Sequence, residues 1–392
     1  MILKLENSLQ NYNWGSRTFL SETYNFTNPH NLPMAELWIG THPKTPSKVH
    51  YNNKISFLSD IINSNPQKLL GSSVYQYFGE LPFLFKIICV ENPLSIQVHP
   101  NKIFAKQGFL KENSRSIPIN SYKRNYKDKN YKPELIYAIT PFHALIGFKT
   151  FAQINSLLNI INEIHPSINI FLRMPNQNNL LKLLKYLLLL KGQEKLKAFN
   201  ILKSKLKLFK EEPWHTIKTI IINYPEDNSL FLLLFFNNIF LKPGEAVFIS
   251  CGTPHIYLKG NAIEISANSD NVLRAGLTSK YIDISEFLMN LKLSDSLLSK
   301  ILIKPKKLQN ELRFPIEILD FAFTIHVLTN ELQNINQKSM AILFCIQGDF
   351  TIIKDDRLLL LKSGESCFVS AEEMPIKIKG NGSLARVFNE LY

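Results

Sequence analysis

Three polar side chains alternate with apolar ones in the segment LSIQVHPN at residues 94–101: Ser95, Gln97 and His99. In an extended strand these three share one face, because successive side chains point to opposite sides. A carboxamide oxygen and an imidazole nitrogen two residues apart can both reach one cation between them. The pair therefore indicates a metal site, although a lone histidine on such a strand is more often structural.

Two further residues supply ligand types that would complete such a site. Glu134 opens the apolar segment ELIYAI and shares a face with Ile136 and Ala138, so its carboxylate is expected to point inward. A buried carboxylate is costly unless a cation or a donor satisfies it. His255 follows a glycine turn in SCGTPH and opens another apolar segment. One amide, one carboxylate and two imidazoles suit Zn²⁺ or another borderline divalent ion, with one position left open.

The spacing by itself supports this grouping only weakly, because its members are far apart in the sequence. His143, in TPFHALIGF, is a rival ligand that we interpret as a core residue. The segment from residue 244 resembles the second motif of the cupin superfamily, G-x5-P-x-G-x2-H-x3-N. Its two glycines and its histidine match at Gly244, Gly252 and His255, whereas Ser and Lys replace Pro and Asn. This motif strengthens the assignment of His255 as a ligand.

The elements that must position these residues are mainly strands. Residues 1–150 contain short apolar segments separated by Pro, Asn and Gly turns, which are typical of β structure. Residues 151–228 carry apolar residues at helical spacing with lysines between them, which predicts three or more packed helices with a solvated lysine face. Strand character returns at residue 229, apart from a helical stretch from about residue 284 to the early 300s.

An internal repeat indicates the kind of β fold. LKPGEAVFISCGTPH (241–255) aligns with LKSGESCFVSAEEMP (361–375), and both copies place a glycine turn before an apolar strand. Two copies of one β unit favour duplicated antiparallel barrels or jelly rolls over a parallel α/β sheet. The second copy has Pro375 where the first has His255, so we expect no metal there.

Composition limits the function classes but identifies no partner. The 392 residues carry a net charge of +13, which could attract nucleic acid, an acidic membrane or a phosphorylated metabolite. Lys, Asn, Ile and Leu are abundant throughout, however, so we interpret the charge as compositional drift. We expect no signal peptide and no membrane span, because no apolar run approaches about 20 residues. Four scattered cysteines predict reduced core thiols and a cytoplasmic protein without disulfides.

Taken together, the motifs resemble the type I mannose-6-phosphate isomerases, which are zinc-dependent enzymes of the cupin superfamily. The matching segments, in order along the chain, are NYNWGSR, AELWIGTHPKTPS, LPFLFKIICVENPLSIQVHPNK, NYKPELIYAITPFHALIGF, GTPHIYLKG and SDNVLRAGLTSKYIDI. The resemblance covers nearly the whole chain and implies a mainly β protein with cupin-type antiparallel barrels or jelly rolls and an all-α insertion. The implied parts are a catalytic cupin domain at 1–150 and 229–315, a helical insertion at 151–228, and a C-terminal cupin-like domain without metal at 316–392.

The resemblance also assigns residues. It implies one Zn²⁺ per subunit, bound by the four residues that the side-chain types select: Gln97, His99, Glu134 and His255. The catalytic arginine of the family falls on Arg274, in RAGLT. The other active-site positions that match the family are Trp14, Glu36, Lys86, Ser95, Lys132, Glu264, Asp270 and Lys280.

The implied reaction interconverts mannose 6-phosphate and fructose 6-phosphate through a cis-enediol. Arg274 would stabilise the enediolate, because a guanidinium stays charged. Glu264 is our preferred base, since desolvation on an apolar strand raises the pKa of a carboxyl; Asp270 and Lys132 are alternatives. The expected substrate contacts are Trp14, Glu36 and, for the phosphate, Ser95, Lys86 and Lys280.

Some alternatives remain open. Tyr131 replaces the His that usually precedes KPE in the family, so any proton transfer by that His is absent here or is performed by a phenol. A cupin dioxygenase would use similar ligands with iron or manganese, and a non-catalytic cupin would only bind sugar. A nucleic-acid binder would depend on the basic helices. We expect a sugar phosphate as the partner, no nucleic acid, no membrane and a monomer.

Overall fold

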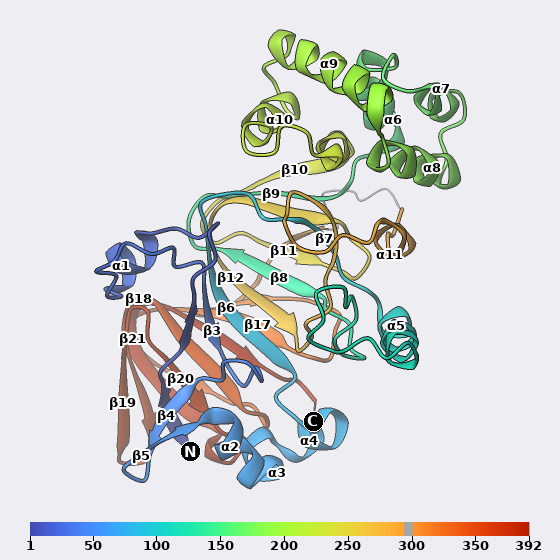
Figure 1. The fold of residues 1–392 in the computed structure, drawn as a ribbon. Coiled ribbons are helices and arrows are strands. Elements are labelled where there is room, and N and C mark those ends of the chain that lie inside the picture. The colour runs from blue at the N-terminus through green and yellow to red at the C-terminus, as the bar shows by residue number, and fades with distance from the viewer. Residues whose placement is uncertain (294–300, 392) are drawn as a thin grey trace.

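The computed structural model describes residues 1–293 and 301–391 and contains two large antiparallel sheets (Figure 1). The 11-stranded sheet holds the candidate site residues. Its strands are β2 (Ser8–Gln10), β3 (Glu36–Ile39), β6 (Phe83–Val90), β7 (Ile96–Val98), β8 (Glu134–Ala138), β9 (Phe142–Phe148), β10 (Phe236–Leu241), β11 (Ala246–Ile249), β12 (His255–Ala267), β13 (Leu273–Gly276) and β14 (Leu302–Ile303).

The second sheet has eight strands and contains both ends of the described chain. Its strands are β1 (Ile2–Leu5), β15 (Lys306–Leu308), β16 (Glu311–Phe314), β17 (Ala322–Ile335), β18 (Ala341–Lys354), β19 (Arg357–Lys362), β20 (Ser366–Val369) and β21 (Ile376–Phe388). β1 pairs with β20, so the N-terminal strand completes the C-terminal sheet. A small separate ribbon pairs β4 (Lys48–Tyr51) with β5 (Lys54–Phe57).

The 11-stranded sheet folds into two layers, and β12 belongs to both. The second half of β12 pairs with β6 and β8, whereas its first half pairs with β7 and β9. The register shifts between Tyr257 and Lys259, and Gly260 follows with a φ of +116°. A Cβ at Gly260 would lie 2.4 Å from the carbonyl oxygen of Pro141, so only glycine fits this bend. The bend carries one strand from the first layer to the second.

Alternation along the strands directs polar side chains into the space between the two layers. In β3, β6, β8 and the second half of β12, odd-numbered positions such as Phe85 and Ile263 lie in the core shared with the C-terminal sheet. The neighbouring even-numbered positions therefore face the opposite way. The side chains of β7 also alternate, but here the even-numbered Ile96 and Val98 pack into the core under the helices. Gln97, between them, points away from that core. Each layer thus has its own apolar support.

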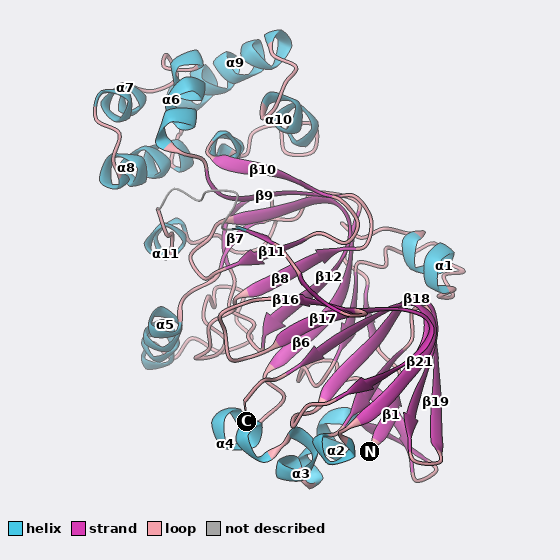
Figure 2. Cartoon of the chain, turned by 180° about the vertical axis from the view of Figure 1, so that it is seen from behind, coloured by secondary structure: helices cyan, strands magenta, loops and turns pink. Residues whose placement is uncertain are grey.

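The helices of the basic segment gather at one end of the molecule, beyond β9 and β10 (Figures 1 and 2). They are α6 (Phe151–Ile160), α7 (Pro166–Arg173), α8 (Gln177–Leu188), α9 (Gly192–Leu208) and α10 (Trp214–Ile220), followed by the 3₁₀ helix η1 (Asn228–Leu234). In α8 the leucines at 183, 184 and 187 are buried, whereas Lys182 and Lys185 are exposed. The prediction of packed helices with a solvated lysine face is confirmed.

The remaining helices lie along the edges of the sheets. They are α1 (Phe19–Tyr24), α2 (Leu58–Ser64), α3 (Pro66–Leu70), α4 (Ser72–Phe78), α5 (Lys102–Ser114), α11 (Ile284–Met289) and the 3₁₀ helix η2 (Ala371–Glu373). The helix predicted from residue 284 begins as expected, and its later part, 294–300, lies outside the described residues. No described helix is long and apolar enough to cross a membrane.

The two copies of the sequence repeat form the same local structure in different sheets. The first runs from the end of β10 through β11 to the start of β12, and the second runs from the end of β19 through β20 to the residue before β21. In each copy a glycine with positive φ turns the chain, at +90° for Gly244 and +83° for Gly364. The following glutamate accepts from the N–H of the lysine three residues earlier, at 2.8 Å and 2.9 Å. The prediction of a mainly antiparallel β fold with a helical segment is confirmed.

Candidate active site and metal centre

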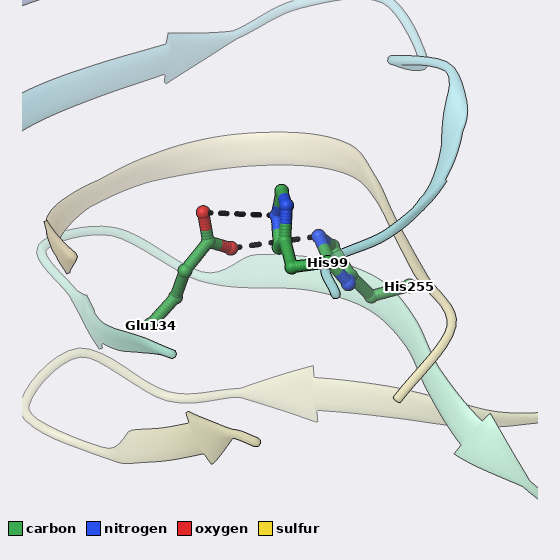
Figure 3. Close-up of side chains that lie close together, drawn as sticks. All are labelled: His99, Glu134 and His255. Carbon is green, nitrogen blue, oxygen red and sulfur yellow. Dashed lines mark ion pairs between the residues drawn. The ribbon is translucent and has the colours of Figure 1, made fainter. Parts of the chain in front are cut away.

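His99, Glu134 and His255 come together between the two layers (Figure 3). Glu134 begins β8, His255 begins β12, and His99 directly follows β7. The Nε2 atom of His99 lies 3.2 Å from Oε1 of Glu134, and Nε2 of His255 lies 3.4 Å from Oε2. The three side chains are 2–3% exposed, and one donor atom of each lies within 4.8 Å of the others. Three buried donors therefore converge on one point.

Main-chain carbonyls orient both imidazoles. Nδ1 of His99 donates to the carbonyl oxygen of Asn271 at 2.7 Å, and Nδ1 of His255 donates to that of Thr253 at 3.1 Å. These bonds leave each Nε2 lone pair directed at the centre, as in metal-binding histidines. Burial lowers the pKa of His255 to about 4, against the attraction of Glu134. His255 is therefore neutral near pH 7, as a metal ligand must be.

Glu134 is held as a carboxylate by its neighbours. Tyr257 donates its O–H to Oε2 at 2.9 Å, and the Lys132 ammonium lies 2.5 Å from Oε1. Burial opposes ionisation, but Lys132 and His99 outweigh it and hold the pKa of Glu134 well below its usual value. One carboxylate and two imidazoles form a set that fits a divalent ion such as Zn²⁺.

Gln97 lies next to this cluster through its strand pairings. It is opposite His255 in one pairing and opposite Arg274 in the other. Its carboxamide N–H donates to Oγ of Ser95 at 3.0 Å, which leaves the carboxamide oxygen as the atom suited to a cation. The alternation in LSIQVHPN thus has the geometry that the sequence predicted.

The candidate residues surround one cavity of about 920 Å³. His99 does not line the cavity wall itself but lies 3.2 Å from Glu134, which does, and the other twelve line the wall directly. These twelve are Trp14, Glu36, Lys86, Ser95, Gln97, Lys132, Glu134, His255, Glu264, Asp270, Arg274 and Lys280.

Lys86 is engaged with two carboxylates. Its ammonium lies 3.1 Å from Oε1 of Glu264 and 3.6 Å from Oε2 of Glu36, and it sits over the ring of Trp38 at 5.1 Å. Trp38 in turn donates its indole N–H to Oε2 of Glu36 at 2.5 Å. Burial lowers the pKa of Lys86, but Glu264 and Glu36 outweigh it and raise the pKa above its usual value. Lys86 is therefore a charged partner of these carboxylates.

Glu264 differs from the other carboxylates of the site. It is 4% exposed, and burial raises its pKa above the usual value although Lys86 opposes the shift. Two buried carboxylates share the single ammonium of Lys86, so neither is neutralised completely. Glu264 can therefore exchange a proton closer to neutral pH than an exposed glutamate can.

Asp270 is strongly stabilised as an anion. His42 lies 3.1 Å from Oδ1 of Asp270, and Lys44 lies 2.8 Å from Oδ2. Burial raises the pKa of Asp270, but the hydrogen bonds from His42 and Lys44 outweigh it and hold the pKa well below the usual range. A carboxylate of such low basicity is a poor proton acceptor.

Arg274 presents an unsatisfied guanidinium to the cavity. Its Nε is buried and has no hydrogen-bond partner among the described residues, and Nη1 makes a 3.4 Å bond to the carbonyl oxygen of Val272. Burial lowers its pKa, and that of Lys280 falls through burial and the nearby charge of Arg274. Lys44 and Lys127 line the same cavity. These four cations form a positive region that would favour an anionic group.

The sequence interpretation missed Trp38, Lys44, Lys127, Tyr257 and the carbonyl of Asn271. Tyr257 could have been found, since it lies two residues after His255 on the same strand and so shares its face. Asn271 acts through its main chain, for which side-chain type gives no signal. Tyr131 was singled out but does not line the cavity; its hydroxyl donates to Asp320 instead.

Comparisons with known proteins agree with this geometry. The model of the phosphomannose isomerase type I catalytic domain matches residues 2–151, and that of the mannose-6-phosphate isomerase cupin domain matches residues 310–389. The mannose-6-phosphate isomerase of Escherichia coli K12 is 51% identical, over 99% of this chain and 100% of its own.

Solved structures give the same result. A crystal structure of a mutant phosphomannose isomerase from Salmonella typhimurium superposes with a TM-score of 0.97 at 48% identity, covering 100% of both chains. A zinc-bound mannose 6-phosphate isomerase superposes with a TM-score of 0.96 at 48% identity, also over 100% of both. The chain belongs to the type I phosphomannose isomerase family.

Proposed function

We propose that the protein is a zinc-dependent aldose–ketose isomerase that interconverts mannose 6-phosphate and fructose 6-phosphate through a cis-enediol. The observation that carries this proposal is the meeting of three unlike groups in one cavity. They are the His99–Glu134–His255 set, the buried carboxylate of Glu264 and the unpaired guanidinium of Arg274. The family relationship supports the same reaction.

Zn²⁺ would be held by His99, Glu134 and His255, with the carboxamide oxygen of Gln97 as a fourth donor. When bound, the ion supplies Lewis acidity toward a carbonyl or hydroxyl oxygen of the sugar. The neutral imidazole of His255 and the ionised carboxylate of Glu134 need no change of protonation to bind it. Lys132 remains beside Glu134 as a charged neighbour of the ligand set.

Glu264 is the group we assign as the base that moves the proton between C1 and C2. It lines the cavity, and its raised pKa gives it the basicity that Asp270 lacks. Lys132 is a weaker candidate, because its ammonium is bound to a ligand carboxylate. Arg274 would stabilise the enediolate, since it lines the cavity and its charge is permanent.

For the phosphate group, Lys280 is the expected contact that the charge distribution favours most. It lies near Arg274, Lys127 and Lys44, whose positive charges lower its pKa. A dianion placed there would reverse this repulsion into attraction. Lys86 suits the phosphate less well, because Glu264 and Glu36 already surround its ammonium. Ser95, Trp14 and Glu36 line the cavity as further substrate contacts.

A coupled assay of mannose 6-phosphate conversion, before and after chelation and Zn²⁺ return, tests the proposal. We expect turnover in the zinc-loaded protein, its loss on chelation and its recovery with Zn²⁺. Oxygen consumption without isomerisation would instead indicate a cupin dioxygenase. Sugar phosphate binding without turnover would indicate a non-catalytic cupin.

Replacing His255 by alanine is expected to weaken Zn²⁺ binding by more than about 100-fold, because groups that only orient a ligand already contribute about 10- to 100-fold. Competition with a chromogenic chelator measures this affinity. His143→Ala is the matched control, since His143 stacks on Phe240 and bonds to Asn238, outside the cluster. Equal zinc affinity in the two variants would contradict the ligand assignment.

Replacing Lys86 by methionine is expected to shift the acidic limb of the pH–rate profile upward by about 1–3 units. An ammonium this close stabilises the charged form of Glu264, so its loss raises the pKa of that carboxyl further. Lys86→Arg keeps the charge and should leave the limb in place. Lys259→Met is the control for loss of a lysine, since Lys259 is exposed on β12. If the acidic limb of the pH–rate profile does not shift in Lys86→Met, Glu264 is not the titrating base.

We also propose that the protein acts as a cytoplasmic monomer that binds no nucleic acid, with the four sequence segments 1–150, 151–228, 229–315 and 316–392 as its parts. The helices of residues 151–220 and the matches at 2–151 and 310–389 support this division. All four cysteines are free, which fits a reducing compartment. Sedimentation analysis and salt-dependent nucleic-acid titration test the oligomeric state and the absence of a nucleic-acid partner.

A further inference from the structure

We infer that Tyr131 is a positioning residue that couples the C-terminal sheet to the metal centre through its hydrogen bond to Asp320. The inference rests on the proposed function, because it concerns how Lys132 and Glu134 are positioned in the proposed active site. It also assigns a role to the phenol that directly precedes Lys132.

The C-terminal end of this connection is rigid. The Tyr131 hydroxyl donates to Oδ2 of Asp320, a residue that is 1% exposed and lies two positions before the start of β17. The carbonyl oxygen of Asp320 accepts from Nδ2 of Asn389 at 3.0 Å. Asn389 is itself fully buried, and its N–H donates to Ser339 at 3.1 Å. Asp320 is therefore a fixed acceptor that belongs to the C-terminal sheet.

The other end of the connection leads directly to a metal ligand. Tyr131 is followed by Lys132, Pro133 and Glu134. Pro133 restricts its own backbone and that of Lys132, so little freedom separates the phenol from the ligand. The Lys132 ammonium lies 2.5 Å from Oε1 of Glu134. A displacement of Tyr131 would therefore move both groups.

The ring of Tyr131 also contacts the segment that carries a second ligand. Nζ of Lys102 lies 5.6 Å from the ring centroid, in the range of a cation–π contact. Lys102 is the first residue of α5, and Asn101 caps this helix by accepting from the N–H of Phe104 at 2.9 Å. His99 lies three residues before Lys102. The side chain of Tyr131, which itself lies just before β8, thus contacts the segment before β17 and the start of α5.

The phenol is poorly placed to transfer a proton to the substrate. Tyr131 and Asp320 do not belong to the cavity wall, and the hydroxyl is directed at the Asp320 carboxylate. Burial and the nearby Asp320 also raise the pKa of Tyr131, so the hydroxyl keeps its proton. Oδ1 of Asp320 is buried without a partner among the described residues, which makes the Tyr131 hydroxyl an important donor to this carboxylate.

The test measures zinc affinity by chelator competition, and kcat and KM with zinc saturating, in Tyr131→Phe, Asp320→Asn and the double variant. We expect Tyr131→Phe to weaken zinc binding about tenfold, as for other groups that orient ligands, and to lower kcat severalfold with little change in KM. Asp320→Asn keeps an acceptor oxygen for the phenol and should stay close to wild type. The double variant should match Tyr131→Phe.

Tyr186→Phe is the matched control, since this tyrosine is 52% exposed on α8 in the helical segment. Thermal unfolding is measured in parallel. A lower unfolding temperature in Tyr131→Phe with zinc affinity and kcat equal to those of Tyr186→Phe would overturn the inference and leave a purely structural bond. If the wild-type protein shows no isomerase turnover, the proposed function fails, whereas the zinc affinities still decide whether Tyr131 positions the metal ligands.

Discussion

Replacing Arg274 by alanine is expected to lower kcat for mannose 6-phosphate by about 100- to 1,000-fold, the range found when a preorganised donor to a developing oxyanion is removed. The guanidinium is buried at the cavity wall, and its Nε has no partner among the described residues. The positive charge of this guanidinium at the cavity wall can therefore stabilise negative charge that appears only during the reaction. The loss should therefore fall mainly on kcat, not on KM.

Two further variants sharpen this test, with the coupled isomerase assay as the measurement. Arg274→Lys keeps a positive charge but loses the planar donor geometry, so we expect only partial recovery. Arg173→Ala removes an exposed arginine from the end of α7 and should behave as wild type. Zinc affinity should be unchanged in all three variants, since Arg274 is no ligand. Undiminished turnover in Arg274→Ala would refute the proposed stabilisation of the enediolate.

The sequence predicted well those features that depend on local alternation. Ser95, Gln97 and His99 could be assigned to one face because Ile96 and Val98 had to be buried, and both are fully buried under the helices. The same period places Glu134 inward at the start of β8. Local chemistry and strand periodicity therefore sufficed to propose the metal ligands before any topology was known.

Strand register, in contrast, could not be predicted, because it depends on pairings between distant segments. Glu264 lies opposite Lys86, and Arg274 lies opposite Gln97, only through the order in which the strands pair. The resemblance to the family suggested Lys86 as a phosphate contact, since a phosphate dianion favours lysines. In the structure, two carboxylates from neighbouring strands, Glu36 and Glu264, lie beside its ammonium. The side-chain type of Lys86 indicates that a negative charge lies near its ammonium, but only the strand pairing shows which residues supply that charge.

The connection between Tyr131 and Asp320 shows a second limit. Neither residue lies in a periodic segment with a clear chemical signature. Tyr131 precedes β8 of the 11-stranded sheet, and Asp320 precedes β17 of the C-terminal sheet. One layer of the 11-stranded sheet, which includes β3, β6 and β8, shares an apolar core with the C-terminal sheet, and this core includes Phe85 and Phe344 with ring centroids 5.8 Å apart. Packing of this core brings Asp320 to Tyr131, so their contact follows from the tertiary structure alone.

Replacing Glu264 by glutamine is expected to lower kcat by about 100- to 10,000-fold, the usual contribution of a positioned general base. The amide keeps the size of the side chain but cannot accept the proton. The carboxyl has a pKa raised by burial, so wild-type kcat/KM should fall as the pH drops through that raised value, where the base becomes protonated. In Glu264→Gln the residual activity should lack this acidic limb.

The choice of base can be decided by comparing Glu264→Gln with Asp270→Asn. His42 and Lys44 hold the pKa of Asp270 so low that it stays ionised across the working range. Its replacement can disturb Lys44 and the substrate, but it cannot remove an acidic limb that it does not produce. Glu163→Gln, an exposed change in the helical segment, controls for the substitution itself. If the limb persists in Glu264→Gln and disappears in Asp270→Asn, the proton is carried by Asp270, and the structural argument from basicity is wrong.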